Sequence, residues 1–242
     1  MFLRYRGGRV PIDSLKIMMT EHIFLPVKAL QWYGTGIYEI QLERQGVEFT
    51  PGDCFALFAR DQKASRPYSV ASGVNDDCIS FVIRRMPNGE VSDYLHTLQP
   101  GDKVKVSPPF GWFRPGEIND GSPFVFIATG TGISPFMCHF RSRGDRPPVQ
   151  LLYGVRQKED AVQLEWLKSQ CDVQLAISRE DCSGYHHGRV TDLFGHLPLN
   201  VNCQYYLCGL DAMIDDATRF LEQHGVELSR IHRECFFNAD YD

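Results

Sequence analysis

A cation, an aromatic ring and a hydroxyl group lie close together in the stretch R-P-Y-S-V-A-S, on Arg66, Tyr68 and Ser69 around Pro67. A guanidinium suits pyrophosphate oxygens, and a ring can stack on a flat ligand while a hydroxyl donates a hydrogen bond. These residues therefore predict a dinucleotide site. An edge strand with polar side chains facing water is the alternative, and the stretch alone leaves both interpretations open.

A second candidate site is the stretch A-T-G-T-G-I-S-P-F, residues 128–136. Gly130 and Gly132 allow a tight turn and a close approach of the backbone to a ligand. Pro135 suits a first helical turn and Ser134 is expected to cap it, so backbone N–H groups would face a pyrophosphate. A tight strand-to-helix turn without a ligand is the alternative. We favour the phosphate site because the turn follows the first strand of an α/β pattern.

This stretch departs from the G-x-G-x-x-G fingerprint, because proline stands where the third glycine would be. The second strand, V-Q-L-L-Y-G-V-R, ends in Arg156 instead of the acidic residue that holds a ribose hydroxyl in NAD-binding folds. Both departures argue against an ordinary dehydrogenase.

The elements that must position Arg66 to Ser69 form a β-rich half. Short runs of β-branched and aromatic residues, separated by turn formers such as T-P-G-D and Q-P-G-D, predict strands at 23–30, 36–43, 54–59, 67–72, 78–85 and 103–107. Alternation in C-I-S-F-V-I-R-R and K-V-K-V-S predicts one buried face for each. A short helix is expected at 91–98, with Ser92 near its start. Strands at this spacing predict a small closed barrel.

The second half alternates strands with helices. Apolar runs at 124–128, 149–154, 173–178 and 204–209 predict buried parallel strands, and residues 160–170 and 211–225 have helical patterns, the second ending at Gly225. This order predicts an α/β layer with helices on both faces. The chain is thus expected to be two-domain: an antiparallel six-stranded β-barrel (19–118) followed by an α/β parallel-sheet domain (119–242), after a lead-in (1–18).

Composition narrows the function classes. The net charge of −5 gives no bulk attraction to nucleic acid or anionic membranes, and no apolar run approaches the ~18 residues that span a bilayer. Eight cysteines occur at irregular intervals without a C-x-x-C pair, so neither a metal site nor an attached iron–sulfur domain is expected. We expect reduced thiols and a cytoplasmic protein. The pair His186-His187 is interpreted as exposed loop residues rather than metal ligands.

Five motifs occur in a fixed order: R-P-Y-S, then G-E-V-S, T-G-T-G-I-S-P, Y-L-C-G and finally E-C-F. In this order the chain, from about residue 20 onward, resembles the ferredoxin–NADP reductase family of flavoproteins. The resemblance implies FAD on the barrel, a nicotinamide nucleotide on the α/β domain and a reaction in the cleft between them.

For the flavin, the resemblance implies that Arg66 pairs with the pyrophosphate, Tyr68 packs on the isoalloxazine and Ser69 hydrogen-bonds near the reactive nitrogen. Gly89, Val91 and Ser92 of the G-E-V-S element would place a helix start against the pyrophosphate. Phe236 takes the place of an aromatic residue that covers the flavin, and Tyr241 folding back is the alternative.

For the nucleotide, the resemblance implies pyrophosphate contacts from one set of residues, namely Gly130, Thr131, Gly132 and Ser134. Cys208 and Gly209 of Y-L-C-G would lie beside the nicotinamide. Glu234 matches a carboxylate near the reacting rings, where a proton relay and a structural ion pair are both open. Ser69, Cys208 and Glu234 are therefore the candidate catalytic residues.

Four residues at strand ends match positions that hold the 2′-phosphate in NADP-using members: Arg156, Ser178, Arg179 and Arg189. We expect NADPH, although S-R-E also occurs in members that use NADH. The implied activity passes electrons from NADPH through FAD to a separate carrier, such as ferredoxin, flavodoxin or an oxygenase component. Three alternatives stay open: an NADH-linked oxygenase reductase component, a non-autonomous electron-transfer subunit of a larger complex, and a nucleotide-binding regulator.

Overall fold

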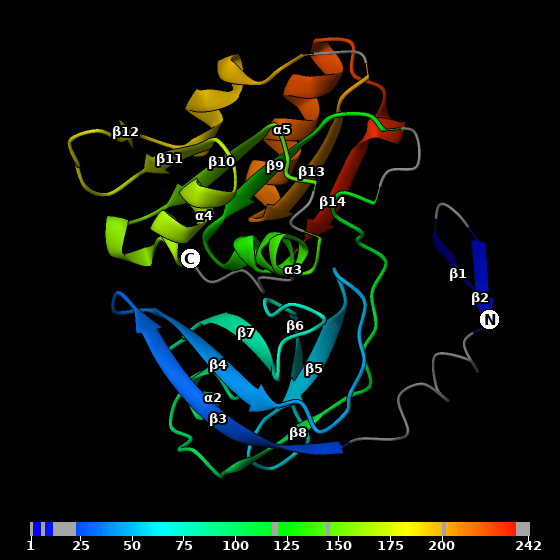
Figure 1. The fold of residues 1–242 in the computed structure, drawn as a ribbon, viewed down its shortest axis with the longest axis vertical. Helices are drawn as coiled ribbons and strands as arrows, with labels where there is room; N and C mark the ends of the chain where they lie inside the picture. The colour runs from blue at the N-terminus through cyan, green and yellow to red at the C-terminus, as the bar shows by residue number, and fades with distance from the viewer. Residues whose placement is uncertain are drawn as a thin grey trace.

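The computed structural model describes residues 2–5, 8–11, 23–117, 121–143, 146–199 and 202–235. Two six-stranded sheets dominate it, one in the β-rich half and one in the α/β half, which lies above the first in Figure 1. Strands β1 (Phe2–Tyr5) and β2 (Gly8–Pro11) form a separate antiparallel pair. In the part of the chain described, no helix is long and apolar enough to cross a membrane.

The β-rich half is an antiparallel sheet in the order β6-β5-β8-β3-β4-β7. Its strands are β3 (Ile23–Tyr33), β4 (Ile37–Glu43), β5 (Cys54–Phe58), β6 (Ser65–Ser69), β7 (Cys78–Arg84) and β8 (Lys103–Val106). A bridge between Val70 and Phe81, with the Ala71 N–H donating to the Ser80 carbonyl at 2.8 Å, joins its two outer strands. This bridge closes the sheet into the predicted six-stranded barrel.

Strand β7 differs from the prediction of a single buried face, because its five central residues are all buried. Ile79, Phe81 and Ile83 belong to the barrel core, as the alternation predicts. Val82 points the other way and joins the core of the α/β half. The outer face of β7 is therefore covered by the second domain, which the sequence of β7 alone does not reveal.

The α/β half is a parallel sheet in the order β12-β11-β10-β9-β13-β14. Its strands are β9 (Phe124–Thr129), β10 (Gln150–Val155), β11 (Val173–Ile177), β12 (His186–His187), β13 (Gln204–Gly209) and β14 (Ile231–Cys235). Helices α3 (Ser134–Ser142) and α4 (Leu164–Gln170) contribute to one core, and α5 (Asp211–Gln223) with η3 (Val190–His196) to another. Helices thus cover both faces, as predicted (Figure 1).

Several element boundaries differ from the predictions. Ser134 does not cap α3: a 3-10 turn η1 (Gly130–Ile133) runs into the helix, and the Ser134 hydroxyl donates to the Thr131 carbonyl at 2.8 Å. Helix α4 begins at Leu164 and not at residue 160, since η2 (Lys158–Asp160) ends in an extended residue. The histidine pair forms β12 instead of a loop.

Two short elements complete the description. Helix α2 (Ser92–Leu95) covers only four of the eight residues with a helical pattern, and η4 (Leu228–Arg230) precedes β14. Helix α5 ends as predicted, because Gly225 adopts the left-handed conformation with φ 83° just beyond it.

The glycine loop gives a test of this packing. A Cβ atom on Gly132 would meet the carbonyl oxygen of Cys208, whereas one on Gly195 would meet nothing within 4 Å. We expect Gly132→Ala to lower the free energy of unfolding by about 1–3 kcal/mol, the usual cost of overpacking. Gly195→Ala is the matched control and should leave it nearly unchanged. Equal denaturation midpoints for both variants would contradict the close approach of loop and strand.

Candidate active site between the two domains

Side chains from both domains converge on the carboxyl group of Glu234. The Ser69 hydroxyl at the end of β6 donates to Glu234 Oε2 at 2.9 Å, although 165 residues separate the two in sequence. Cys208 lies beside Glu234 in the parallel register of β13 and β14, and its Sγ is 3.7 Å from Oε2. The structure therefore brings together all three predicted catalytic residues.

Cys54 is a fourth member of this cluster that the sequence did not single out. It pairs with Ser69 in the β5–β6 register, and its Sγ is 3.4 Å from Ser69 Oγ and 3.6 Å from Glu234 Oε1. A cysteine that starts an apolar strand looks like core packing. Only the pairing of β5 with β6 identifies its place.

The environment of Glu234 favours its protonated form. Burial raises the pKa of the Glu234 carboxyl, and hydrogen bonds from Ser69, Cys208 and Cys54 offset this only in part. Burial, reinforced by the charge of Glu234, also raises the pKa of Cys208 and of Cys54. Both sulfurs are therefore thiols that donate toward the carboxyl. The arrangement places a carboxyl with a raised pKa at the boundary of the domains, within hydrogen-bond reach of the Ser69 hydroxyl.

Residues Arg66 to Ser69 all lie on β6, which pairs with β5. Arg66 and Pro67 are exposed, and within the part of the chain described the Arg66 guanidinium donates to the neighbouring Ser65 carbonyl at 2.9 Å. Tyr68 is half-buried against the barrel core. Because strand side chains alternate, Arg66 and Tyr68 share one face while Ser69 points to the other, toward Glu234. The cation remains accessible beside the ring, as a phosphate-bearing aromatic ligand requires.

The G-E-V-S element packs around the start of α2. Val91 is buried in the barrel core, and Ser92 Oγ accepts from the Met86 N–H at 3.0 Å. A Cβ on Gly89 would lie 2.9 Å from the Met86 carbonyl oxygen, so this glycine is required by the turn itself. The contacts of this element account for its fold, and its contact with a flavin stays a prediction.

The two loop glycines have different neighbours. Gly132 is pressed against the end of β13, so packing alone explains it. Gly130 has φ 53°, and the only atom near its Cβ position is Arg84 Nη2 at 3.7 Å. The open side of the loop therefore faces a guanidinium. Thr131 lies between Gly130 and Gly132 in η1, and Gly209 follows Cys208 at the end of β13.

Arg84 belongs to a group of guanidiniums that the sequence predicted only in part. Burial lowers the pKa of Arg84, and the positive charges of Arg156 and Arg179 lower it further, whereas Asp160 raises it. Among the described residues, no partner makes a hydrogen bond or ion pair with the Arg84 side chain. The Arg84 guanidinium therefore lies beside Gly130 and is close enough to Arg156 and Arg179 for their charges to act on it, and such a group of guanidiniums suits a phosphorylated ligand. The signal for Arg84 was the pair R-R at the end of β7.

The remaining predicted anchors lie nearby along the sheet edge. Arg156 follows β10 directly, and its carbonyl accepts from the Arg179 N–H at 2.9 Å. The Ser178 hydroxyl donates to the Val155 carbonyl at 3.2 Å. Arg189 starts η3, where its N–H donates to Asp192 Oδ2 at 2.8 Å, and its contact with a nucleotide stays a prediction. Phe236 and Tyr241 lie outside the described residues.

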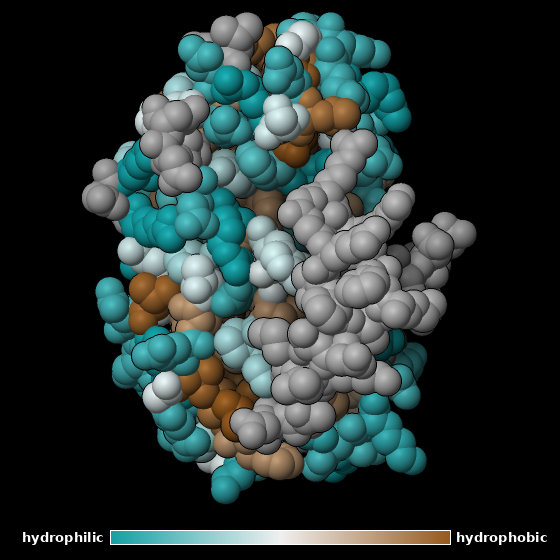
Figure 2. Space-filling model, turned by 90° about the vertical axis from the view of Figure 1, so that its right-hand side faces the viewer, coloured by the Kyte–Doolittle hydropathy of each residue, from teal (hydrophilic) through white to brown (hydrophobic). Residues whose placement is uncertain are grey.

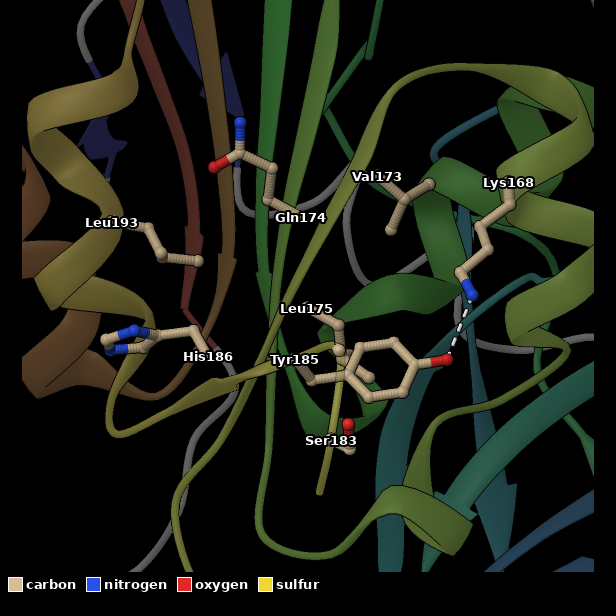
Figure 3. A pocket seen from close by; sticks show the side chains of 9 residues that line it. Lys168, Val173, Gln174, Leu175, Ser183, Tyr185, His186 and Leu193 are labelled. Atoms are coloured by element: carbon tan, nitrogen blue, oxygen red, sulfur yellow. Dashed lines mark hydrogen bonds between the residues drawn. The ribbon is translucent and has the colours of Figure 1, made fainter. Parts of the chain in front are cut away.

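A separate hollow of about 400 Å³ lies at the outer edge of the parallel sheet, between α4, β11 and β12. The Lys168 ammonium donates to the Tyr185 hydroxyl at 2.9 Å, a hydrogen bond that is dashed in Figure 3. None of the predicted site residues lines this hollow, so it is not the predicted site. On the face drawn in Figure 2, the coloured apolar residues form small patches among hydrophilic ones. Within the described ranges, no group of three or more His, Cys, Asp or Glu residues is placed to hold a metal ion.

Two family models match the chain, one in each domain. The oxidoreductase FAD-binding domain matches residues 31–114, and the oxidoreductase NAD-binding domain matches residues 126–219. The matches fall on the barrel and on the parallel sheet. The chain belongs to the ferredoxin–NADP reductase-like family of flavoproteins, with one FAD-binding and one NAD(P)-binding domain.

Curated relatives include the reductase component of naphthalene 1,2-dioxygenase/salicylate 5-hydroxylase systems from Ralstonia, 30% identical over 203 residues, covering 79% of this chain and 61% of the relative. The electron transfer component of toluate 1,2-dioxygenase from Pseudomonas putida is 28% identical, covering 78% and 59%. The chain therefore spans about three fifths of the length of these relatives.

Solved structures give the same fold. A cytochrome P450 reductase from Amycolatopsis has a TM-score of 0.80 at 26% identity, covering 90% of this chain and 71% of that one. A ferredoxin NADP⁺ reductase from Neisseria gonorrhoeae, with bound FAD and NADP, has a TM-score of 0.80 at 19% identity, covering 89% and 99%. The second likeness concerns the fold alone.

The raised pKa of Glu234 predicts a pH-dependent stability. Folding raises the pKa of this carboxyl. Its contribution to stability is fully present when the pH is below the pKa of the unfolded state, and it is lost as the pH rises through the pKa of the folded state. Glu234→Gln mimics the protonated group at every pH. We therefore expect the melting temperature of the variant, relative to the unsubstituted protein, to increase from about pH 4 to about pH 8. A difference that stays constant or decreases over this range would contradict a buried, protonated Glu234.

Proposed function

We propose that the chain is an FAD-dependent NAD(P)H oxidoreductase that takes electrons from NADPH and passes them to a separate electron-carrier protein. The observation that carries the proposal is the convergence on Glu234 of Ser69 from the barrel and Cys208 from the α/β domain. A reaction between two ligands held by different domains needs such a meeting point, with the reacting atoms a few ångströms apart.

The residues of the barrel that face the site fit FAD. Tyr68 offers a half-buried ring and Arg66 an accessible guanidinium on the same face of β6. Ser69 presents a hydroxyl that donates to the buried Glu234 carboxyl, whose pKa is raised by burial. When bound, the flavin supplies the redox chemistry, taking a hydride from the nucleotide and releasing electrons singly.

In the α/β domain, the residues around the glycine loop and the ends of β13 and β14 would bind and orient the nucleotide. The open face of Gly130 leaves room for a pyrophosphate beside Arg84. Cys208 and Glu234, which are neighbours at the ends of β13 and β14, would border the nicotinamide, and burial raises the pKa of the Glu234 carboxyl there. The eight cysteines are all free, which supports a reducing compartment such as the cytoplasm.

We infer NADPH over NADH from charge. The positive charges of Arg156 and Arg179 both lower the pKa of Arg84, whereas Asp160 and Tyr153 raise it. A phosphate monoester adds up to two negative charges to the ligand, and this group of guanidiniums has the excess positive charge to receive it.

The acceptor we propose is a separate ferredoxin, flavodoxin or oxygenase component. The relatives named above are a ferredoxin–NAD(P)⁺ reductase component and an electron transfer component of dioxygenases. These relatives favour a second candidate, a reductase component of an oxygenase system. An NADH-linked form of it would have the same site chemistry and would differ in its nucleotide and carrier.

Nucleotide choice is tested with Arg179→Ala. A lost charge-assisted contact to a phosphate costs about 1.5–3 kcal/mol, so kcat/KM for NADPH should fall roughly ten- to hundredfold while kcat/KM for NADH changes little. The measurement is anaerobic reduction of the flavin-loaded protein by each nucleotide. Arg219→Ala, which removes an exposed guanidinium on α5, is the matched control. Equal losses with both nucleotides would exclude a phosphate clasp, and failure of both nucleotides to reduce the unsubstituted protein would exclude the proposed activity.

A further inference from the structure

Helix α3 is shared by the two domains. It begins directly after the glycine loop, and its buried side chains Phe136, Met137 and Phe140 belong to the core of the α/β half. Cys138, however, belongs to the core of the barrel. The helix that carries the nucleotide loop at its start is thus also part of the barrel's packing.

The last turn of α3 is fixed to the segment that follows β6. Arg141 Nη1 donates to the Ala71 carbonyl at 2.9 Å, and the Val74 N–H donates to Ser142 Oγ at 3.0 Å. A Cβ on Gly73 would lie 2.9 Å from both the Cβ and the carbonyl oxygen of Arg141, so the two segments touch. Ala71 is two residues beyond Ser69. One helix therefore connects the flavin-side strand to the nucleotide loop.

The guanidinium of Arg141 has partners in both domains. Its Nη2 donates to Gln163 Oε1 at 2.9 Å, its plane lies over the Trp166 ring at 5.2 Å, and its Nη1 is 3.7 Å from Glu39 Oε1. Gln163 and Trp166 come from the α/β half, whereas Glu39 is on barrel strand β4. None of these contacts involves the Glu234 cluster or the glycine loop.

Glu39 is the barrel residue that faces the Arg141 guanidinium. Its side chain is only 1% exposed, and its Oε2 accepts from the Tyr33 hydroxyl at 3.1 Å and from Gln163 Nε2 at 3.3 Å. Burial and the neighbouring carboxylate raise the pKa of Tyr33 to about 12, so this hydroxyl stays a donor. A buried carboxylate is costly unless it is paired and hydrogen-bonded. Glu39 satisfies this condition only while both domains are in place.

The same interface extends to the segment that begins at Arg156, one of the predicted 2′-phosphate anchors. Gln163 has φ 48°, a left-handed conformation that is rare without glycine, and it ends the segment that starts at Arg156. Gly34, at the tip of the β3–β4 hairpin, packs against Glu159 and Asp160 of that segment. Barrel contacts thus hold the backbone between Arg156 and Gln163, the residue that bonds to both Arg141 and Glu39.

We propose that Arg141 and Glu39 form an interdomain clamp that sets the distance and orientation of the nucleotide loop relative to β6. The two are positioning residues, acting through α3 and through residues 156–163 without touching either ligand. The inference rests on the proposed function for what is positioned, but the clamp itself is a statement about domain geometry.

The test compares Arg141→Gln with the matched control Arg219→Ala. Because a misplacement of about 1 Å costs roughly a hundredfold in rate, flavin reduction at saturating NADPH should slow by about ten- to hundredfold in Arg141→Gln. Affinity for the adenosine bisphosphate fragment of NADPH should stay within about twofold, since its predicted anchors belong mainly to one domain. The control should match the unsubstituted protein in both. Unchanged reduction, or an equal loss of rate and fragment affinity, would overturn the clamp.

A second readout does not depend on activity. Spin labels on bioorthogonal residues at the exposed positions Lys63 and Glu222 report the distance between barrel and α5. We expect a broader distance distribution in Arg141→Gln and an unchanged one in Arg219→Ala. Identical distributions would overturn the clamp even if the rate fell. This readout decides the clamp whether or not either nucleotide reduces the flavin.

A double-mutant cycle supplies the remaining control. If Arg141 and Glu39 act as one unit, the combined Glu39→Gln and Arg141→Gln variant should lose less rate than the product of the two single losses. Arg141→Lys, which keeps the charge but not the planar fork, should recover part of the rate and replaces Arg141→Gln if that variant does not fold. Independent losses, or a Lys variant with no recovery at a normal melting temperature, would overturn the pairing.

Discussion

One hydrogen bond across the domain boundary constrains the whole molecule: the Ser69 hydroxyl of the barrel must reach the Glu234 carboxyl of the parallel sheet, 2.9 Å away. Both residues stand at strand ends, so neither can adjust without moving a sheet. The barrel must be closed at Val70 and Phe81 to fix the end of β6, and β14 must pair in register with β13 to fix Glu234. A shift of one residue in either ladder would point the side chain away from the site.

The interface that makes this contact possible is built by residues with ordinary sequence roles. Val82 and Ile37 are apolar strand residues, but they pack under the α/β half and not inside the barrel. Cys138 is a helix residue that packs into the barrel. Because apolar surface is exchanged in both directions, the two domains share part of their cores, and the site between them is held by packing as well as by polar contacts.

The barrel and the parallel sheet could be predicted from the spacing of short apolar runs and turn residues. The trio Ser69, Cys208 and Glu234 could be picked out from the order of the sequence motifs that contain them. Strand β14 was missed, since I-H-R-E-C carries charged residues and lies at the sheet edge. Cys54 was missed because it looks like an ordinary strand residue until the pairing of β5 with β6 is known. Glu39 was missed because its partner Arg141 lies on α3, in the other domain. Arg84 was within a predicted strand, but its neighbours Arg156 and Arg179 come from the other domain.

We propose that the barrel binds the flavin with its reactive edge facing the Ser69–Glu234 contact. An experimental structure of the protein with FAD tests it most directly. The account predicts the isoalloxazine against the Tyr68 ring, with its reactive nitrogen within hydrogen-bond distance of the Ser69 hydroxyl and the pyrophosphate beside Arg66. A flavin bound elsewhere, or a barrel whose groove around Tyr68 is filled by side chains, would contradict it.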